Sequence, residues 1–395
     1  MRMAIVADWL TTFGGAEHVI AELHALWPEA PLFTTVAQTT CLGPLACADI
    51  RPTPLQKWYR ILRNHQPMLP LMPRAVETID LRGFDLVVSS SHAVAKGCIP
   101  PSTAVHVCYC HTPMRYAWEM EEEYLQDFHI PRFLRPLLQW QLRKLRRWDL
   151  TTSKRVDHFI ANSRTTQERI KRIYNRDSVV IPPPVHDRFF AAPLPSRCQV
   201  SGVRCQVKHH RQEAETWKLK PGSYMLSVSR LVPYKRIDLL IAAANTARFP
   251  LVIVGDGQER SRLWHLAGPM VRFLGPLSDE ELPALYTGAT ALLFPALEDA
   301  GLAPMEAQAC GTPVIAYGRG GVCDTVVEGV TGLFFFEQSV PAILAAVEKF
   351  HARSWDPDRI RSHARRFSAE RFREKISEEV ERAIERFGKR AVVSP

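Results

Sequence analysis

Two carboxylates stand eight residues apart in the segment EDAGLAPMEAQACGTPVIA. Glu298 directly follows an apolar run, and Gly301 removes a side chain so that backbone N–H groups can approach an anion. Pro304 suits the start of a helix whose first turn would hold Glu306. A helix start attracts anions, whereas a carboxylate accepts hydrogen bonds from sugar hydroxyls. The spacing therefore predicts a phosphate-binding helix start bracketed by two carboxylates.

Other residues with the right chemistry also follow apolar runs. Arg230 and Lys235 come after the run at 224–230 and supply the positive charge that a diphosphate needs. Gly15 and His111 follow apolar runs in the first half of the chain. If all these runs are parallel strands, their carboxyl ends form one ligand-binding edge in each sheet. The residues together predict a pocket for a nucleotide diphospho-sugar.

The elements that must position these residues alternate along the chain. Short apolar runs predict strands, and the stretches between them carry apolar residues at helical spacing. We expect an α/β fold with two Rossmann-like domains that face each other across a cleft. Strands are predicted at 2–8, 84–91, 104–111, 156–163, 178–185, 224–230, 250–257, 271–277, 290–296 and 312–318. Helices are predicted at 16–27, 164–174 (capped by Ser163), 236–247, 259–267, 278–289 (capped by Ser278) and 304–310.

Prolines and changes in sequence pattern predict the domain boundaries. A triple proline at 182–184 can continue neither a helix nor a central strand, so the first domain is predicted to span 1–185. Residues 186–220 resemble a linker with an insertion, and 221–367 form the second domain. Residues 368–395 hold a helix that is expected to cross back to the first domain and to present one apolar face, formed by Phe372, Ile376, Val380 and Ile384. The insertion Cys198–His210 contains two cysteines and two histidines, but their spacing matches no standard zinc site.

Composition narrows the class of protein and its partners. The 395 residues are 46% hydrophobic and 23% charged, which is typical of a globular protein, and the net charge of +9 favours an anionic partner. Nine cysteines without regular spacing predict reduced thiols in a cytoplasmic protein, and we expect neither a signal peptide nor a membrane span. The basic, apolar stretches 56–63 and 132–149 fit either peripheral contact with an anionic inner membrane face or packing on the first domain.

Two further motifs are weak signals. VIVGDGQER has Arg260 where a dinucleotide-binding loop needs its third glycine. The D-P-D at 356–358 has the pattern of a metal motif, but it precedes a predicted helix, and capping explains it better. We therefore expect no catalytic metal and no cofactor, because basic side chains and a helix start take the place of a cation.

The chain resembles the family 4 retaining glycosyltransferases of the GT-B fold over most of residues 1–375. The loop at 298–306 matches their E-x7-E signature, and SVSRLVPYKRIDLLI matches their Arg/Lys segment. VIVGDG, FLGPLSDEEL and GTPVIAYGRGGVCDTVVEGVTGLFF follow in the family's order. CYCHTPMRYAWE, RVDHFIANS and VIPPPV resemble the mannosyltransferase branch that builds O-antigens and exopolysaccharides. The family's usual aromatic residue in the signature loop is replaced by Ala300.

The resemblance implies a role for each candidate residue. Glu298 would bind hydroxyls of the donor sugar, Glu306 would bind the ribose, and Arg230 and Lys235 would bind the diphosphate. The backbone of Ala300, Gly301 and Leu302 would contact sugar and phosphate. Gly15 would let a helix start approach the diphosphate, and His111 would lie near the anomeric carbon.

The function implied is retaining transfer of a hexose, with mannose favoured, in the synthesis of cell-surface polysaccharide. The donor would be a nucleotide diphospho-sugar, GDP-mannose rather than a UDP-hexose, and it is a substrate and not a cofactor. The acceptor would be a glycan or a polyprenyl-linked saccharide on the side of the first domain (1–185), and the nucleotide sugar would bind to the second domain (221–367). Nucleic acid is not an expected partner. Two alternatives remain open: an inactive partner protein on the same fold, and a Rossmann oxidoreductase.

Overall fold

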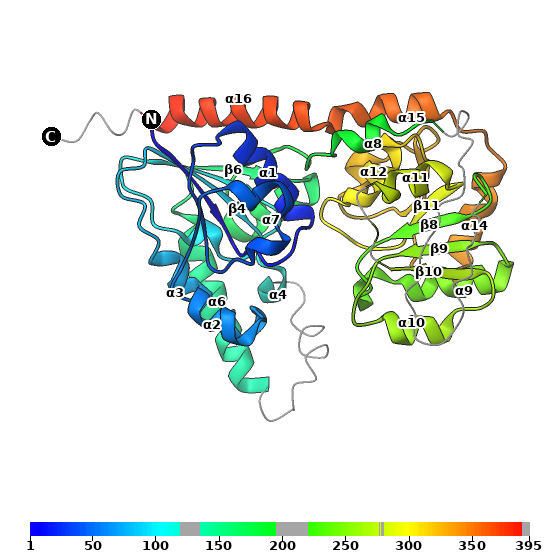
Figure 1. Ribbon diagram of the computed structural model, residues 1–395, viewed down its shortest axis with the longest axis horizontal. Coiled ribbons are helices and arrows are strands. Elements are labelled where there is room, and N and C mark those ends of the chain that lie inside the picture. Colours follow the sequence, from blue (N-terminus) through cyan, green and yellow to red (C-terminus); the bar gives the residue numbers. More distant parts are fainter. Residues whose placement is uncertain (119–134, 195–219, 276, 278–279, 389–395) are drawn as a thin grey trace. The chain divides into compact units, whose positions relative to one another are not determined.

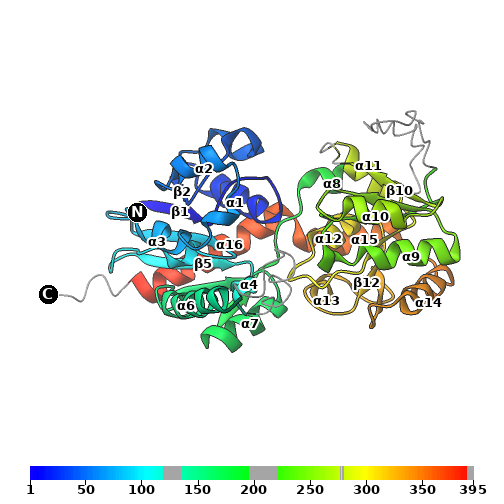
Figure 2. The same cartoon turned by 90° about the horizontal axis from the view of Figure 1, so that it is seen from below.

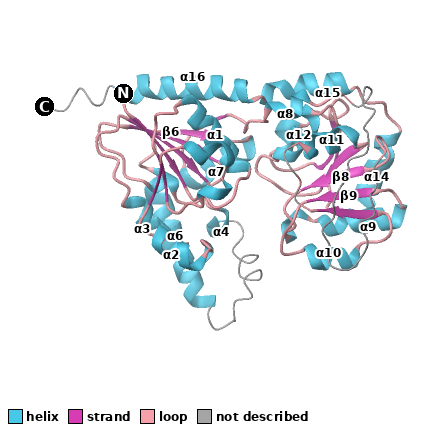
Figure 3. Cartoon of the chain, in the orientation of Figure 1, coloured by secondary structure: helices cyan, strands magenta, loops and turns pink. Residues whose placement is uncertain are grey.

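The computed structural model describes residues 1–118, 135–194, 220–275, 277 and 280–388. Its contacts divide the chain into two compact units (Figure 1). Unit 1 comprises Met1–Pro184 together with Phe372–Pro395, and unit 2 comprises Val185–Arg371. In each unit, strands form a central sheet and helices cover it (Figure 3).

The sheet of unit 1 is parallel, with the strand order β3-β2-β1-β4-β5-β6-β7. The order runs one way from β1 to β3 and the other way from β4 to β7, so the switch point lies between β1 and β4. Its strands are β1 (Met3–Ala7), β2 (Leu32–Thr34), β3 (Ile50–Pro52), β4 (Leu86–Ser91), β5 (Val105–Cys110), β6 (His158–Ala161) and β7 (Ser178–Val180), and its helices are α1 (Gly15–Leu26), α2 (Gln56–Leu62), α3 (Met72–Glu77), α4 (Arg115–Trp118), α6 (Arg135–Ser153), α7 (Arg164–Tyr174) and, from Phe372 on, α16 (Ala369–Phe387).

Alternate residues of β1 serve opposite faces of this sheet, as the two-residue period of a strand requires. Ile5 packs in a core with α1 and α16, whereas Val6 packs in a second core with α2 and α3. The predicted apolar face of the last helix is confirmed. Its residues Phe372, Ile376 and Val380 are buried in the core of unit 1, and Ile384 packs against them.

Unit 2 repeats the design with a parallel sheet in the order β10-β9-β8-β11-β12-β13. Here the switch point lies between β8 and β11. The strands are β8 (Met225–Val228), β9 (Leu251–Val254), β10 (Val271–Leu274), β11 (Ala291–Phe294), β12 (Val314–Tyr317) and β13 (Gly332–Phe335), and the helices are α8 (Asp187–Ala191), α9 (Ile237–Ala247), α10 (Arg260–Leu266), α11 (Glu281–Gly288), α12 (Leu302–Ala309), α13 (Val322–Thr325), α14 (Val340–His351) and α15 (Pro357–Ala364).

Both faces of the unit 2 sheet are covered, which explains why its strands are continuously apolar. Leu226 of β8 packs in a core with α11 and α12, and the neighbouring Met225 packs in a second core with α9 and α14. These helices can be followed around β12 in the view from below (Figure 2). The two units therefore have the same layered construction.

Local sequence signals predict most of these elements. Each predicted strand contains an observed one, and the Ser163 side chain accepts the N–H of Thr166 at the start of α7, as expected of a cap. The patterns do not predict β2, β3 or β13, which are only three or four residues long. Among the described helices, none combines the length and apolar content that crossing a bilayer needs.

Two predictions about helix and linker positions need correction. The cap proposed at Ser278 is wrong, because α11 begins at Glu281 with Glu280 in the cap position and no side-chain cap. Ser278 itself lies outside the described residues. The segment predicted as a linker begins with α8, whose Phe189 is buried in the core of unit 2. The insertion Cys198–His210 lies outside the described residues, as do residues 132–134 of the basic stretch.

Candidate active site

Two predicted residues meet at the switch point of the unit 2 sheet. The Lys235 ammonium forms an ion pair with the Glu298 carboxylate, joining the loop after β8 to the loop after β11. Lys235 is only 8% exposed, and Glu298 is partly buried. An ion pair that is shielded from water in this way holds both side chains more firmly than a surface pair does. The structure therefore brings together a cation and a carboxylate where parallel α/β sheets bind ligands.

Close packing of loops holds Lys235 in place. The chain after β8 is pinned to the loop after β9, because Leu231 N donates to Asp256 O at 2.9 Å and Glu259 N donates to Leu231 O at 3.0 Å. A Cβ atom on Gly257 would come within 2.3 Å of Leu231 O, so only glycine permits this approach. The chain then forms a 3-10 turn at Pro233–Lys235. The glycines of VIVGDG thus shape a loop that supports the cation.

Arg230 lies in the same loop but is more exposed. Its Nη2 donates to the Tyr234 hydroxyl at 3.2 Å. The structure therefore brings Arg230 and Lys235 to the same carboxyl-end loop. Lys235 is paired with Glu298, while Arg230 lies on an exposed stretch beside Tyr234.

The Glu298 loop rests on the glycine pair that follows β12. Gly321 N donates to Glu298 O at 2.8 Å. A Cβ on Gly321 would lie 1.9 Å from Asp299 O and 2.7 Å from the Cα of Ala300. Side chains there would push the Glu298 loop away, so the Gly320-Gly321 pair is a steric requirement of the site.

The helix start after this loop differs from the sequence-based prediction. Gly301 adopts a left-handed conformation (φ 71°) and caps α12, so the helix begins at Leu302. Pro304 is then the third helical residue instead of the first, and Glu306 is the fifth, in the second turn. The prediction that Glu306 lies in the first turn is wrong, because the turn at Gly301 starts the helix two residues early. No side chain caps α12, and Gly301 is its N-cap residue.

Glu306 is held from within unit 2. It is 8% exposed, and its Oε2 accepts the hydroxyl of Tyr286 on α11 at 2.9 Å. Burial and the charge of Glu306 raise the pKa of Tyr286 well above its usual value, so this phenol stays a donor. Sequence spacing does not point to Tyr286, which lies 20 residues away from its partner.

The predicted residues of unit 1 lie at the carboxyl edge of its own sheet. Gly15 is the first residue of α1, and among the described atoms none lies within 4 Å of where its Cβ would be. His111 follows β5, with its Nε2 2.8 Å from Ser90 Oγ. Burial and the neighbouring His92 lower the pKa of His111 to about 3, so its imidazole is neutral at physiological pH.

Sequence reasoning missed two residues at this edge, Asp8 and His92. Asp8 directly follows β1 and His92 directly follows β4, the two strands that flank the switch point. Their side chains are joined, with His92 Nδ1 2.9 Å from Asp8 Oδ2. The signal was present in the sequence, because a polar residue ends each apolar run, as Glu298 and His111 do.

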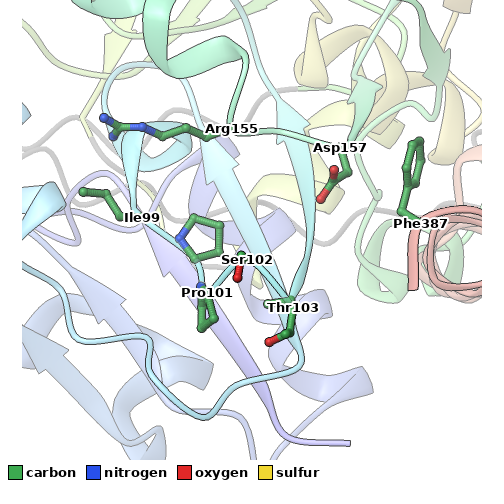
Figure 4. A pocket seen from close by; sticks show the side chains of 9 residues that line it. Ile99, Pro101, Ser102, Thr103, Arg155, Asp157 and Phe387 are labelled. Atoms are coloured by element: carbon green, nitrogen blue, oxygen red, sulfur yellow. The ribbon is translucent and has the colours of Figure 1, made fainter. Parts of the chain in front are cut away.

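A pocket of about 240 Å³ lies elsewhere in unit 1, at the amino ends of β5 and β6 (Figure 4). Its charged lining residues already have partners in the fold. Arg155 pairs with Glu77 at 2.8 Å, and Asp157 Oδ2 accepts the N–H of His106 at 2.9 Å. This pocket is therefore at the edge of the sheet opposite to the predicted site residues, and its polar groups are structural.

The D-P-D motif is a helix cap, as predicted. Asp356 Oδ1 accepts the N–H groups of Asp358 and Arg359 at the start of α15. In the described part of the chain, no three His, Cys, Asp or Glu side chains are grouped so that they could hold a metal ion.

The fold defines a class of protein: two parallel α/β units with ligand-type residues at each switch point are the GT-B fold. HepE of Anabaena, solved in complex with UDP-glucose, is 18% identical, with a TM-score of 0.66 over 96% of this chain and 100% of that chain. Sucrose-phosphate synthase from Thermosynechococcus elongatus is 19% identical, with a TM-score of 0.67 over 97% of this chain and 99% of that chain. At these identities the likeness establishes the fold alone.

Family comparison then identifies each half of the chain. Residues 13–189 match the family described as Glycosyltransferase Family 4, and residues 211–367 match Glycosyl transferases group 1. The chain therefore carries a Glycosyltransferase Family 4 domain followed by a glycosyl transferases group 1 domain. The candidate residues Arg230, Lys235, Glu298 and Glu306 fall in the second match, and Gly15 and His111 fall in the first.

Curated relatives match over shorter stretches. D-inositol 3-phosphate glycosyltransferase of Salinispora tropica is 32% identical over 204 residues, which are 45% of this chain and 40% of the relative. GDP-mannose-dependent alpha-(1-6)-phosphatidylinositol monomannoside mannosyltransferase of Mycolicibacterium smegmatis is 34% identical over 151 residues, 34% of this chain and 40% of the relative. The chain thus spans less than half the length of these relatives. Neither name indicates the O-antigen branch, which stays a prediction.

Proposed function

We propose that the protein is a retaining glycosyltransferase that moves a hexose from a nucleotide diphospho-sugar to a saccharide acceptor. The observation that carries this proposal is the Lys235–Glu298 pair at the switch point of unit 2. A cation is suited to a diphosphate and a carboxylate is suited to sugar hydroxyls, so the pair combines the two recognition elements that a sugar diphosphate needs. The pair also lies within the stretch that matches the glycosyl transferases group 1 family.

The ion pair gives a simple account of donor binding. Without a donor, the two charges neutralise each other. A bound donor would offer its diphosphate to Lys235 and its hydroxyls to Glu298, so both side chains would exchange one partner for another without being left unpaired. No side chain caps the start of α12, so its N–H groups at Leu302 and Ala303 would face the same anionic group.

The remaining residues have supporting roles in this proposal. Arg230 would add a second cation at the diphosphate, and Glu306 would accept hydrogen bonds from ribose hydroxyls while Tyr286 holds it. His111, as a neutral imidazole, would hydrogen-bond the transferred sugar near its anomeric carbon. Gly15 would let the start of α1 approach the diphosphate. No metal is needed, because cations of the chain balance the charge of the leaving group.

The donor we favour is GDP-mannose. Support comes from the Mycolicibacterium relative, whose name states GDP-mannose dependence. A UDP-hexose is the alternative, since the Anabaena protein of the same fold was solved with UDP-glucose. The favoured acceptor is a glycan or lipid-linked saccharide used in cell-surface polysaccharide. The names of the other relatives make an inositol phosphate the second acceptor class to test.

A panel of labelled nucleotide sugars tests the proposal. The purified chain is incubated with GDP-mannose, UDP-glucose and UDP-galactose without acceptor, and both binding and release of free hexose are measured. We expect one donor to be bound and slowly hydrolysed. Binding without turnover, with or without saccharide acceptors, would favour an inactive partner protein. Binding of a nicotinamide dinucleotide in place of all three sugars would favour an oxidoreductase.

We further propose that unit 1 contacts an anionic membrane surface. Helix α2 exposes Trp58, Ile61 and Leu62 next to Arg60 and Arg63. Helix α6 exposes Trp140, with the Lys144 ammonium 3.5 Å from its ring centroid. Exposed apolar side chains interleaved with basic ones suit the boundary between lipid headgroups and acyl chains.

Vesicle sedimentation tests the membrane contact. We expect binding to vesicles that contain anionic lipid, with weaker binding as salt rises. Trp58→Ser should reduce binding, whereas Val179→Ser, which removes an exposed apolar side chain elsewhere on unit 1, should not. Equal binding to neutral and anionic vesicles, unaffected by salt, would contradict the proposal.

A further inference from the structure

Asp8 and His92 form a preorganised pair in unit 1 that the proposed donor site does not use. Asp8 is 2% exposed, and its two carboxylate oxygens accept the backbone N–H groups of His92, Ala93, Val94 and Ala95 at 2.5–3.1 Å. Burial raises the pKa of Asp8, but the charge of His92 and these hydrogen bonds outweigh it and lower the pKa to about 2. The carboxylate is therefore ionised and fixed in direction.

This carboxylate sets the tautomer of His92. An ionised carboxylate can only accept, so the Nδ1 atom, which lies 2.9 Å from Asp8 Oδ2, carries the proton. In the neutral imidazole, Nε2 is then the hydrogen-bond acceptor. The His92 side chain is 29% exposed, so a ligand at the carboxyl edge of the sheet can reach it. The arrangement is that of an imidazole aimed by a buried carboxylate.

Aromatic rings surround the pair. The ring of Trp9 meets His92 edge to face, with centroids 4.6 Å apart, and is stacked on His65 at 4.8 Å. The ring of His111 lies 6.2 Å from that of His92. Thr11 Oγ1 lies 3.3 Å from His65 Nδ1. A polar group beside the flat apolar ring of Trp9 is the combination that binding sites use to fix the orientation of a small polar ligand.

The charge of this cluster suits an uncharged ligand. The titratable groups around His92 include Asp8 and Glu17 on the acidic side, and His65 and His111, whose pKa values burial lowers. Glu17 is buried and accepts the N–H of Gly14 at 3.0 Å. The ionised carboxylate of Asp8 disfavours an anion at His92, so an uncharged hydroxyl is the better partner for this imidazole, while Gly15 at the start of α1 remains available to the diphosphate.

We infer that His92, held by Asp8 beside Trp9, binds a hydroxyl of an uncharged saccharide acceptor through Nε2. The inference rests on the proposed glycosyltransferase function and deepens it by naming the side chain of unit 1 that binds the acceptor. Its position supports it, since Asp8 and His92 follow β1 and β4, the strands that flank the switch point. Lys235 and Glu298 occupy the corresponding place in unit 2.

Three variants test the role of His92. His92→Ala removes the side chain. His92→Asn keeps an amide N–H where Nδ1 donates to Asp8 but has no atom at the position of Nε2. His351→Ala, at the exposed end of α14 in unit 2, is the matched control. The uncharged probes are octyl α-D-mannoside, octyl β-D-glucoside, octyl β-D-galactoside and myo-inositol, each titrated by ligand-observed NMR.

We expect the wild-type chain to bind at least one probe. His92→Ala and His92→Asn should each weaken that binding about tenfold or more, as expected for the loss of one well-placed hydrogen bond, while His351→Ala binds normally. Donor hydrolysis without acceptor should stay within about twofold in all three variants, since His92 is inferred to contact the acceptor, whereas His111 contacts the donor sugar. The Asn variant keeps the hydrogen bond to Asp8, so a loss of probe binding in this variant is not explained by loss of that structural bond.

Any of three results would overturn this inference. The first is that the wild-type chain binds none of the four probes. The second is that His92→Asn binds as well as the wild-type chain, and the third concerns donor hydrolysis. Failure of the proposed function is seen in the separate donor assay, as the absence of binding and hydrolysis of every nucleotide sugar. Equal loss of donor hydrolysis and probe binding would assign His92 to the donor and contradict the inference.

Discussion

The carboxyl edges of the two sheets have the same topology and different chemistry. In unit 2 the switch point holds the ion pair Lys235–Glu298, with a cation ready for an anionic group. In unit 1 it holds Asp8–His92, with His111 nearby as a neutral imidazole. A common layout of strands therefore provides two positions for ligands, and the charge of the residues at each position selects what binds. We expect the anionic donor at unit 2 and an uncharged acceptor at unit 1.

The largest expected effect concerns the cation of unit 2. Lys235→Ala should lower kcat about a hundredfold, because negative charge grows on the diphosphate as the glycosidic bond breaks, and an interaction that strengthens in the transition state acts on kcat. The loss corresponds to roughly 3 kcal/mol. Steady-state kinetics with the identified donor measures it. Lys349→Ala, on the exposed face of α14, removes the same charge elsewhere and should leave kcat unchanged. An equal loss of kcat in Lys235→Ala and Lys349→Ala would show that the cation at the unit 2 switch point has no special role in catalysis.

The next effect tests the neutral histidines of unit 1 through pH. Burial lowers the pKa of His111 to about 3 and that of His106 to about 4. Because the folded pKa is below the unfolded value near 6.5, the stability linked to each imidazole is fully present above pH 6.5 and is lost as pH falls toward 4. Each histidine should cost on the order of 2 kcal/mol of unfolding free energy between pH 7 and 5.

Urea unfolding of the full chain at these two pH values measures that loss. His111→Asn should remove about one histidine's share of the pH dependence, because the variant has no imidazole to protonate. Variation of stability with pH that is identical in the wild-type chain and in His111→Asn would show that His111 has the same pKa in the folded and unfolded chain, which would contradict this prediction.

A smaller effect separates the two carboxylates of unit 2. Glu306→Ala should raise the donor KM about tenfold with little change in kcat, because ribose hydroxyls gain no charge during transfer. Tyr286→Phe keeps the carboxylate and removes only the hydroxyl that it accepts, so its KM should rise less. If Glu306→Ala lowers kcat as much as Lys235→Ala while KM stays fixed, Glu306 acts on the transferred group and the division of roles is wrong.

The smallest expected effect is none at all. Transfer should continue unchanged in EDTA, since Lys235 and the start of α12 supply the positive charge that a metal supplies elsewhere, and Asp356 of the D-P-D motif is occupied as a helix cap. Activity is measured with the identified donor before and after chelation. Loss of activity that Mn²⁺ restores would contradict this prediction.

Much of the fold could be predicted from local patterns. Apolar runs of four to six residues become strands, and Ser163, Asp356 and Gly311 mark helix ends where capping chemistry places them. These signals work because backbone hydrogen bonding and burial act on neighbouring residues. The predicted start of α12 is two residues late, because the sequence around Gly301 does not show that this glycine adopts a left-handed turn.

By itself, the sequence determined the two alternating β/α halves, the strand ends that carry Lys235 and Glu298, and the apolar face of the last helix. Only the tertiary structure decided which of these residues meet. Asp8 receives hydrogen bonds from residues 84 to 87 positions away, because parallel strands joined by crossovers become neighbours in an order that differs from the order of the chain. Glu306 receives one from Tyr286, because α11 and α12 pack in the same core. Local periodicity carries no information on that order, so the partners of a site residue depend on the sheet.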